Sequence, residues 1–134
     1  MILDSELKEC SSPAVLTEEG EWEKIFRPGP GFIGFSGHFP GKPVLPAIVQ
    51  LRMLRILFEE AVGPIGLPDI TSAKFLTPAV PDISLSVRIR RNAERWIARI
   101  EAIDGPAPSS VSEFRFKVPS HGQDTISPSK PLAD

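Results

Sequence analysis

Apolar and polar positions alternate through much of this chain, and the pattern changes once, in a dense apolar stretch. Residues 83–90 carry isoleucine, leucine or valine at every second position, which predicts a strand with one buried face. The same reasoning predicts extended segments over 21–27, 32–35, 70–75, 96–103 and 111–118. The dense stretch from Ala47 to about Val62 predicts a helix that ends at Gly63-Pro64. Residues 1–20 give only a weak amphipathic signal and predict no element.

The predicted helix is too apolar to lie on a protein surface. Around its axis only Arg52, Arg55 and Glu59 form a polar stripe, and apolar side chains cover most of the remaining circumference. The strands that follow are joined by short connections, so we expect antiparallel neighbours that curl around the helix. The expected class is therefore α+β, with a single domain over residues 1–119 and a flexible tail rich in serine and proline over 120–134.

Composition narrows the cellular setting and the classes of partner. Fifteen basic and seventeen acidic residues give a formal net charge of −2, so no overall positive field favours nucleic acid. Cys10 is the only cysteine, which excludes an intrachain disulfide and a cysteine-based metal site. The first residues do not resemble a signal peptide, and the apolar stretch is too short to cross a membrane. We expect a cytoplasmic protein without a metal, a cofactor or a membrane span.

A loop rich in proline and glycine leads into the predicted helix and carries His38. Pro46 suits the first helical position, and the backbone N–H groups that follow it lack intrahelical partners at the positive end of the helix dipole. They can bind an anion or a polarised carbonyl oxygen. A histidine about nine residues upstream can serve beside them as an acid or a base. The alternative is a structural histidine that hydrogen-bonds to the loop backbone.

The loop carries a motif that resembles a known family. Its sequence is Gly37-His38-Phe39-Pro40-Gly41-Lys42-Pro43-Val44-Leu45-Pro46. It is similar to the motif of the hot-dog-fold β-hydroxyacyl-acyl-carrier-protein dehydratases of fatty-acid synthesis and their relatives in polyene pathways. A second similarity covers residues 73–81, after the predicted helix, and the resemblance extends over roughly residues 22–118.

The resemblance implies a sheet wrapped around one central helix and a homodimer, or a higher oligomer of dimers, with an acyl tunnel at the interface. The implied substrate is a 3-hydroxyacyl thioester on acyl carrier protein or coenzyme A. By resemblance His38 is the catalytic histidine, and the backbone N–H of Ala47 polarises the thioester carbonyl. Phe39, Pro46 and Gln50 are expected to line the tunnel.

Position 52 departs from the family pattern. The family has Glu or Asp fourteen residues after the motif histidine, and this chain has Arg52. Because arginine stays protonated, it cannot shuttle a proton as a carboxylate does. Arg52 either belongs to a solvated stripe or lies in the tunnel as a cation that binds an anionic group. The function that the resemblance implies is dehydration of (3R)-hydroxyacyl thioesters, with an altered acid position in this chain. The alternatives are acyl-chain or carrier-protein binding without catalysis, and thioester hydrolysis.

Overall fold

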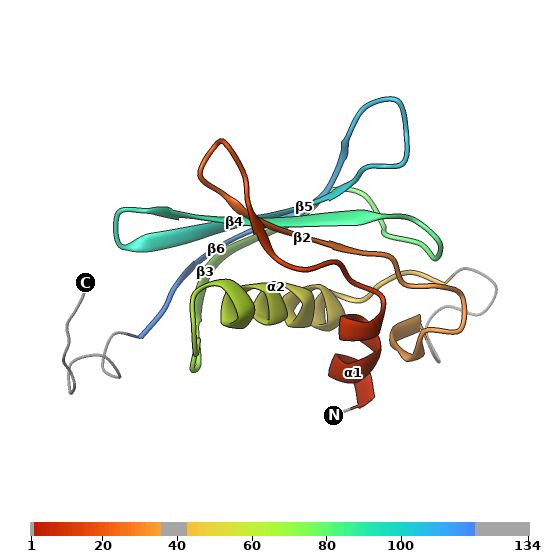
Figure 1. Ribbon diagram of the computed structural model, residues 1–134, viewed down its shortest axis with the longest axis horizontal. Helices are drawn as coiled ribbons and strands as arrows, with labels where there is room; N and C mark the ends of the chain where they lie inside the picture. The colour runs from red at the N-terminus through yellow and green to blue at the C-terminus, as the bar shows by residue number, and fades with distance from the viewer. Residues whose placement is uncertain (1, 36–42, 120–134) are drawn as a thin grey trace.

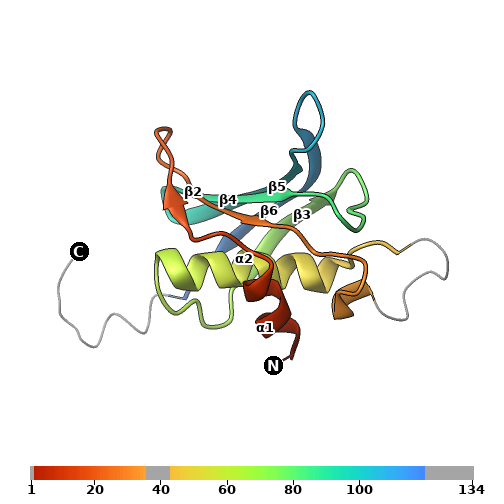
Figure 2. The same ribbon diagram turned by 45° about the vertical axis from the view of Figure 1, so that its right-hand side comes forward.

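One long helix, α2 (Ala47–Ala61), packs against one face of a six-stranded antiparallel sheet in the computed structural model, which describes residues 2–35 and 43–119 (Figure 1). The shorter elements before it are α1 (Ile2–Glu9), β1 (Val15–Leu16), β2 (Trp22–Phe26) and the 3₁₀ turn η1 (Ile33–Phe35). Those after it are β3 (Asp69–Phe75), β4 (Leu85–Asn92), β5 (Arg95–Ala102) and β6 (Ser109–Lys117). Both helices lie on the same side of the sheet (Figure 2).

The sheet confirms the expected α+β class and the meander of the last three strands. Its order is β1-β2-β4-β5-β6-β3, so β2 joins the meander beside β4 and β3 joins it beside β6. The alternation predicted for β4 is confirmed, because Leu85, Val87 and Ile89 are all fully buried on the face of the sheet that carries α2. The strand pattern therefore located these strands, although it did not determine the positions of β2 and β3 in the sheet.

Helix α2 begins and ends close to the predicted residues. Pro46 is the capping residue and not the first helical residue, with φ −68° and ψ 161°, and Ala47 opens the helix. At the other end the N–H groups of Val62 and Gly63 both donate to the carbonyl of Phe58, at 2.7 and 3.1 Å. Gly63 has φ 144°, a backbone conformation that residues with side chains rarely adopt. The Gly-Pro stop signal was therefore correct.

Two N-terminal segments differ from the expectations. Residues 32–35 are not extended: they form η1, in which the Phe35 N–H donates to the Phe32 carbonyl at 3.1 Å. The ring of Phe32 packs edge-on against that of Phe35, so this short apolar run is buried by a turn and not by strand pairing. The weak signal at the start of the chain is a helix, α1, whose Leu7 is fully buried. Its packing against α2 explains why so short a helix forms.

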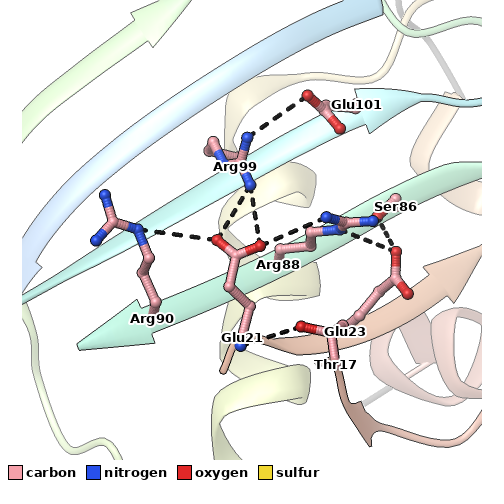
Figure 3. Close-up of polar contacts among 8 residues, drawn as sticks. All are labelled: Thr17, Glu21, Glu23, Ser86, Arg88, Arg90, Arg99 and Glu101. Carbon is pink, nitrogen blue, oxygen red and sulfur yellow. Dashed lines mark hydrogen bonds and ion pairs between the residues drawn. The ribbon is translucent and has the colours of Figure 1, made fainter. Parts of the chain in front are cut away.

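The face of the sheet opposite the helices carries a network of charged side chains, which we call the outer-face network (Figure 3). Glu21 lies at its centre, only 5 % exposed. Its carboxylate pairs with Arg88, Arg90 and Arg99, at nearest distances of 3.4, 3.8 and 3.0 Å. Glu23 accepts hydrogen bonds from Arg88 and from the hydroxyl of Ser86. The arginines of this network are thus neutralised by neighbouring carboxylates.

Candidate functional site

The amino end of α2 presents backbone donors without acceptors. Val49 and Gln50 make the first intrahelical bonds, both to the carbonyl of Pro46, and Pro46 offers no side-chain cap. Among residues 2–35 and 43–119 the N–H groups of Ala47 and Ile48 have no acceptor. Ala47 is exposed, so its N–H is available to a ligand. The helix dipole adds positive potential at this point, which favours an oxygen atom that gains negative charge.

Gln50 fixes this helix end to the sheet. Its side chain is 4 % exposed, and its amide nitrogen donates to the carbonyl of Leu45 at 3.2 Å. Its amide oxygen accepts a hydrogen bond of 2.6 Å from Ser112 of β6. The Leu45 N–H in turn donates to the carbonyl of Ala79 at 2.8 Å. These bonds hold the turn before α2 in place from both sides, and Gln50 is enclosed between helix and sheet in the single subunit.

Arg52 lies against α1, an arrangement that neither sequence interpretation foresaw. Its guanidinium binds both carboxylate oxygens of Asp4, with Nε to Oδ1 at 3.0 Å and Nη2 to Oδ2 at 2.6 Å. The two side chains are 27 % and 28 % exposed. This bidentate hydrogen bonding lowers the pKa of Asp4 below its usual range, so the carboxylate stays ionised. The other residues of the stripe, Arg55 and Glu59, form the expected pair one turn apart at 3.4 Å.

A second ion pair, which the sequence analysis missed, lies beside the first. Lys24 of β2 is 5 % exposed and donates to Glu60 of α2 and to the carbonyl of Ser12, each at 2.6 Å. The N–H of Ala14 also donates to Glu60, and these bonds lower the pKa of that carboxyl, the one to Lys24 most. The available signal was a lysine at an inward position of β2, two residues before the fully buried Phe26.

Both ion pairs line one cavity of about 610 Å³ between α1, residues 11–13 and α2. We call Asp4–Arg52 and Lys24–Glu60 the helix-side pairs. Their charges cancel within each pair, so the cavity offers no strong net charge to a ligand.

His38 and Phe39 lie outside the described residues, as do Lys42 and the tail expected over 120–134. The described residues on either side of the histidine loop, Phe35 and Pro43, line one shallow hollow of about 450 Å³ together with Glu6 of α1. The carboxylate of Glu6 accepts a hydrogen bond of 2.9 Å from the N–H of Ile33. Helix α1 therefore contacts both η1 and α2, the elements on either side of this loop.

Residues 2–35 and 43–119 contain no cluster of three or more side chains suited to hold a metal ion. No helix within these residues is long and apolar enough to cross a membrane.

Comparison with known proteins gives a family. The family model described as ApeI-like, ApeI dehydratase, matches residues 15–117. The 3-hydroxyacyl-acyl-carrier-protein dehydratase FabZ of Anaeromyxobacter sp. (strain Fw109-5) is 32% identical over an alignment 111 residues long, which covers 71% of this chain and 66% of that protein. The chain spans about half to two thirds of the length of the curated relatives it matches.

Solved structures show the fold. An uncharacterized protein from Erwinia carotovora subsp. atroseptica aligns with a TM-score of 0.66 at 21% identity, over 81% of this chain and 91% of that one. The dehydratase heterocomplex ApeI:P from Xenorhabdus doucetiae aligns with a TM-score of 0.64 at 18% identity, over 81% and 95%. The expected hot-dog fold is confirmed.

Proposed function

Because this chain belongs to the ApeI-like dehydratase family, we propose that it acts on (3R)-hydroxyacyl thioesters of acyl carrier protein in fatty-acid or polyene-type lipid synthesis. The observation that carries the proposal is the family match over residues 15–117, which includes the His38 motif and the start of α2. The unpartnered N–H of Ala47 supports it, since acyl chemistry of this kind needs a fixed donor for the thioester oxygen.

In the proposed reaction His38 removes a proton from the α-carbon of the substrate. Negative charge then develops on the thioester oxygen, where the backbone N–H of Ala47 and the positive end of α2 stabilise it. The double bond forms between the α- and β-carbons as the β-hydroxyl leaves, and this hydroxyl must receive a proton to depart as water. Phe39 and Pro46 are proposed to border the acyl chain, and Gln50, which was expected there too, is proposed to hold the turn before α2 from inside the subunit.

The proton for the departing hydroxyl is not supplied from position 52 of this chain. Arg52 cannot donate and return a proton at physiological pH, and its charge is neutralised by Asp4. Asp4 is held ionised by the same pair, so it is a poor general acid. We therefore propose that the acid comes from a second hot-dog subunit. The ApeI:P heterocomplex among the structural relatives supports a partner that differs from this chain.

Strand β3 supports association with such a partner. It is an edge strand of the sheet, and most of its residues are exposed. Ile70 is 37 % exposed, and Phe75 and Leu76 at its end are 53 % and 60 % exposed. An exposed apolar edge strand readily pairs with another chain. Pairing of β3 with the edge of a second subunit would bury these side chains.

The decisive experiment measures enoyl formation from a 3-hydroxyacyl-carrier-protein substrate. The unaltered chain is assayed alone and together with an acid-bearing hot-dog dehydratase from the same cell. We expect turnover in the mixture that His38→Ala in this chain reduces by at least about a hundredfold, the range that general acid–base groups contribute. Turnover that is unchanged by His38→Ala would contradict the proposal.

A second candidate function is acyl-chain binding without catalysis, and the Asp4–Arg52 pair is the observation that favours it. Arg52→Glu combined with Asp4→Asn restores a carboxylate at position 52 without placing two negative charges together. If this double variant gains dehydratase activity alone, the remaining site geometry is intact. Thioesters that bind and remain unchanged in every combination would favour the binding function. Release of free thiol would instead indicate hydrolysis.

A further inference from the structure

A second pocket lies at the carboxyl end of α2, at the opposite end of the helix from Ala47. Its volume is about 630 Å³. Its apolar walls come from Phe58, Val62, Pro64, Trp96, Val118 and Pro119. Since α2 has fifteen residues, the two ends of the helix are roughly 20 Å apart. The pocket is therefore separate from the candidate thioester site.

Aromatic rings form one wall of this pocket. The rings of Phe58 and Trp96 meet edge to face with centroids 4.9 Å apart. Trp96 is also stacked on Phe116, with centroids 6.5 Å apart and planes at 16°. Phe116 is fully buried, so the indole is supported from behind by the core. A wall fixed in this way loses little conformational entropy when an apolar group binds to it.

Two basic residues, Arg91 and Lys117, line this pocket. Arg91 is paired in register with Trp96, so both side chains belong to the face of the sheet that carries α2. Every second residue before it on β4, from Leu85 to Ile89, is apolar and buried, and Arg91 interrupts that series. The guanidinium is oriented by a hydrogen bond of 3.0 Å from Nε to the carbonyl of Ala93.

Lys117 also lines the pocket, but it follows the buried Phe116 on β6, so its side chain belongs to the opposite face of the sheet from Trp96, and Glu94 is the only carboxylate among the lining residues. Within residues 2–35 and 43–119, neither Arg91 nor Lys117 forms an ion pair. They contrast with the arginines of the outer-face network, which are paired with carboxylates. The pocket thus combines an apolar wall with a guanidinium, that of Arg91, which forms no ion pair among the described residues.

We infer that this pocket binds an amphipathic monocarboxylate, with its apolar body against Phe58 and Trp96 and its carboxylate on Arg91. Pockets that bind small molecules are mostly apolar with a few placed polar groups, and this one has that composition. The carbonyl end of α2, near Gly63, is negative and disfavours an anion. The carboxylate is therefore held at the strand side of the rim. The inference does not depend on the proposed function.

The test uses decanoate and the fluorescence of Trp96. The chain has two tryptophans, so Trp22→Phe leaves Trp96 as the only one. We expect a saturable change in its emission on titration with decanoate. Arg91→Gln should weaken binding about tenfold or more, because charge-assisted hydrogen bonds to the carboxylate are lost. Binding of uncharged decanol should be the same in both proteins.

A matched control separates the pocket from the overall charge. Arg95→Gln removes one exposed cation that does not line the pocket, and should leave decanoate affinity within about twofold. Calorimetry with the unaltered chain repeats the titration in case Trp22→Phe impairs folding. Absence of saturable binding, or equal weakening by both variants, would overturn the inference.

Residues 120–134 of the chain are an alternative ligand for the pocket, because these fifteen residues follow Pro119, which lines it. Ile126→Ser with Leu132→Ser removes the two large apolar residues of 120–134 in the full chain. The inference expects decanoate affinity to stay within about twofold. A rise of about tenfold or more would show that these residues compete for the pocket, and the carboxylate site would then be rejected.

Discussion

The helix-side pairs and the outer-face network both neutralise arginine or lysine, but they are built differently. Each helix-side pair joins segments far apart in the chain: Asp4 to Arg52 across 48 residues and Lys24 to Glu60 across 36. In each pair the cation hydrogen-bonds to one carboxylate of the described residues, Asp4 or Glu60. In the outer-face network Glu21 alone contacts three arginines, and Arg88 also binds Glu23.

The outer-face network also joins distant segments, Glu21 to Arg99 across 78 residues, so the difference between the two places lies in the number of partners that each charge has. Loss of one helix-side carboxylate removes a link between elements and leaves a partly or fully buried cation. Loss of one arginine from the outer face leaves each carboxylate with another partner or with water. We therefore expect substitutions at the two places to differ in cost, although both break visible ion pairs.

The largest effect is expected from Arg52→Glu, which places a second carboxylate against Asp4. The variant loses the bidentate pair and places two carboxylates together at a site where the side chains are only about a quarter exposed. We therefore expect a loss of about 2 to 3 kcal/mol in the free energy of unfolding. Urea unfolding followed by circular dichroism measures it. The charge-swapped variant with Asp4→Arg should recover more than half of the loss. A single variant as stable as the unaltered chain would show that α1 does not depend on this pair.

Glu60→Gln should have the next largest effect. It leaves the Lys24 ammonium, which is almost completely buried, with the carbonyl of Ser12 and a neutral amide in place of a carboxylate. We expect a loss of about 1 to 2 kcal/mol by urea unfolding, less than for a fully buried pair because Glu60 is 41 % exposed. Glu59→Gln on the same helix is the matched control, and should change stability by less than about 0.5 kcal/mol.

These two pairs also mark the limit of prediction from sequence. The alternation in β4 and the apolar run of α2 are local signals, so both elements were predicted with nearly correct bounds. The partners of Arg52 and Lys24 lie 48 and 36 residues away, and no local pattern links them. Helix α1 is stabilised by tertiary packing of Leu7, which a propensity argument does not register.

For the candidate site, the sequence located the start of α2 and the exposed Ala47 N–H through its proline signals. It did not give the orientation of Arg52, because a residue at the edge of a polar stripe can turn toward solvent or toward a neighbouring helix. The sequence likewise did not predict that Arg91, Trp96 and Phe116 lie side by side, because they come from three different strands. Register, which depends on sheet order, brings them together.

The effect of low pH on the free energy of unfolding gives a third test of the helix-side pairs, with a smaller expected effect. Asp4 and Glu60 have pKa values lowered chiefly by hydrogen bonds from Arg52 and Lys24. A carboxyl with a lowered folded-state pKa contributes stability above its unfolded pKa, near 4, and loses it as pH falls through the folded value. The free energy of unfolding, measured from about pH 5 to pH 2.5, should therefore fall more steeply in the unaltered chain than in Asp4→Asn with Glu60→Gln, and solvent screening at these partly exposed groups keeps the difference small. Parallel pH profiles would contradict the assignment.

Arg88→Gln should have the smallest effect, although it breaks two ion pairs in the structure. Arg88 is 31 % exposed, and after its loss Glu21 still binds Arg99 while Glu23 still accepts a hydrogen bond from Ser86. No carboxylate is left buried without a donor, so the cost should stay near 0.5 kcal/mol by urea unfolding. Adding Arg99→Gln removes the remaining close partner of the buried Glu21 carboxylate and should cost more than the sum of the two single changes. Additive behaviour would mean that Arg90 or water replaces both arginines, and that the outer face is held together by its backbone ladder alone.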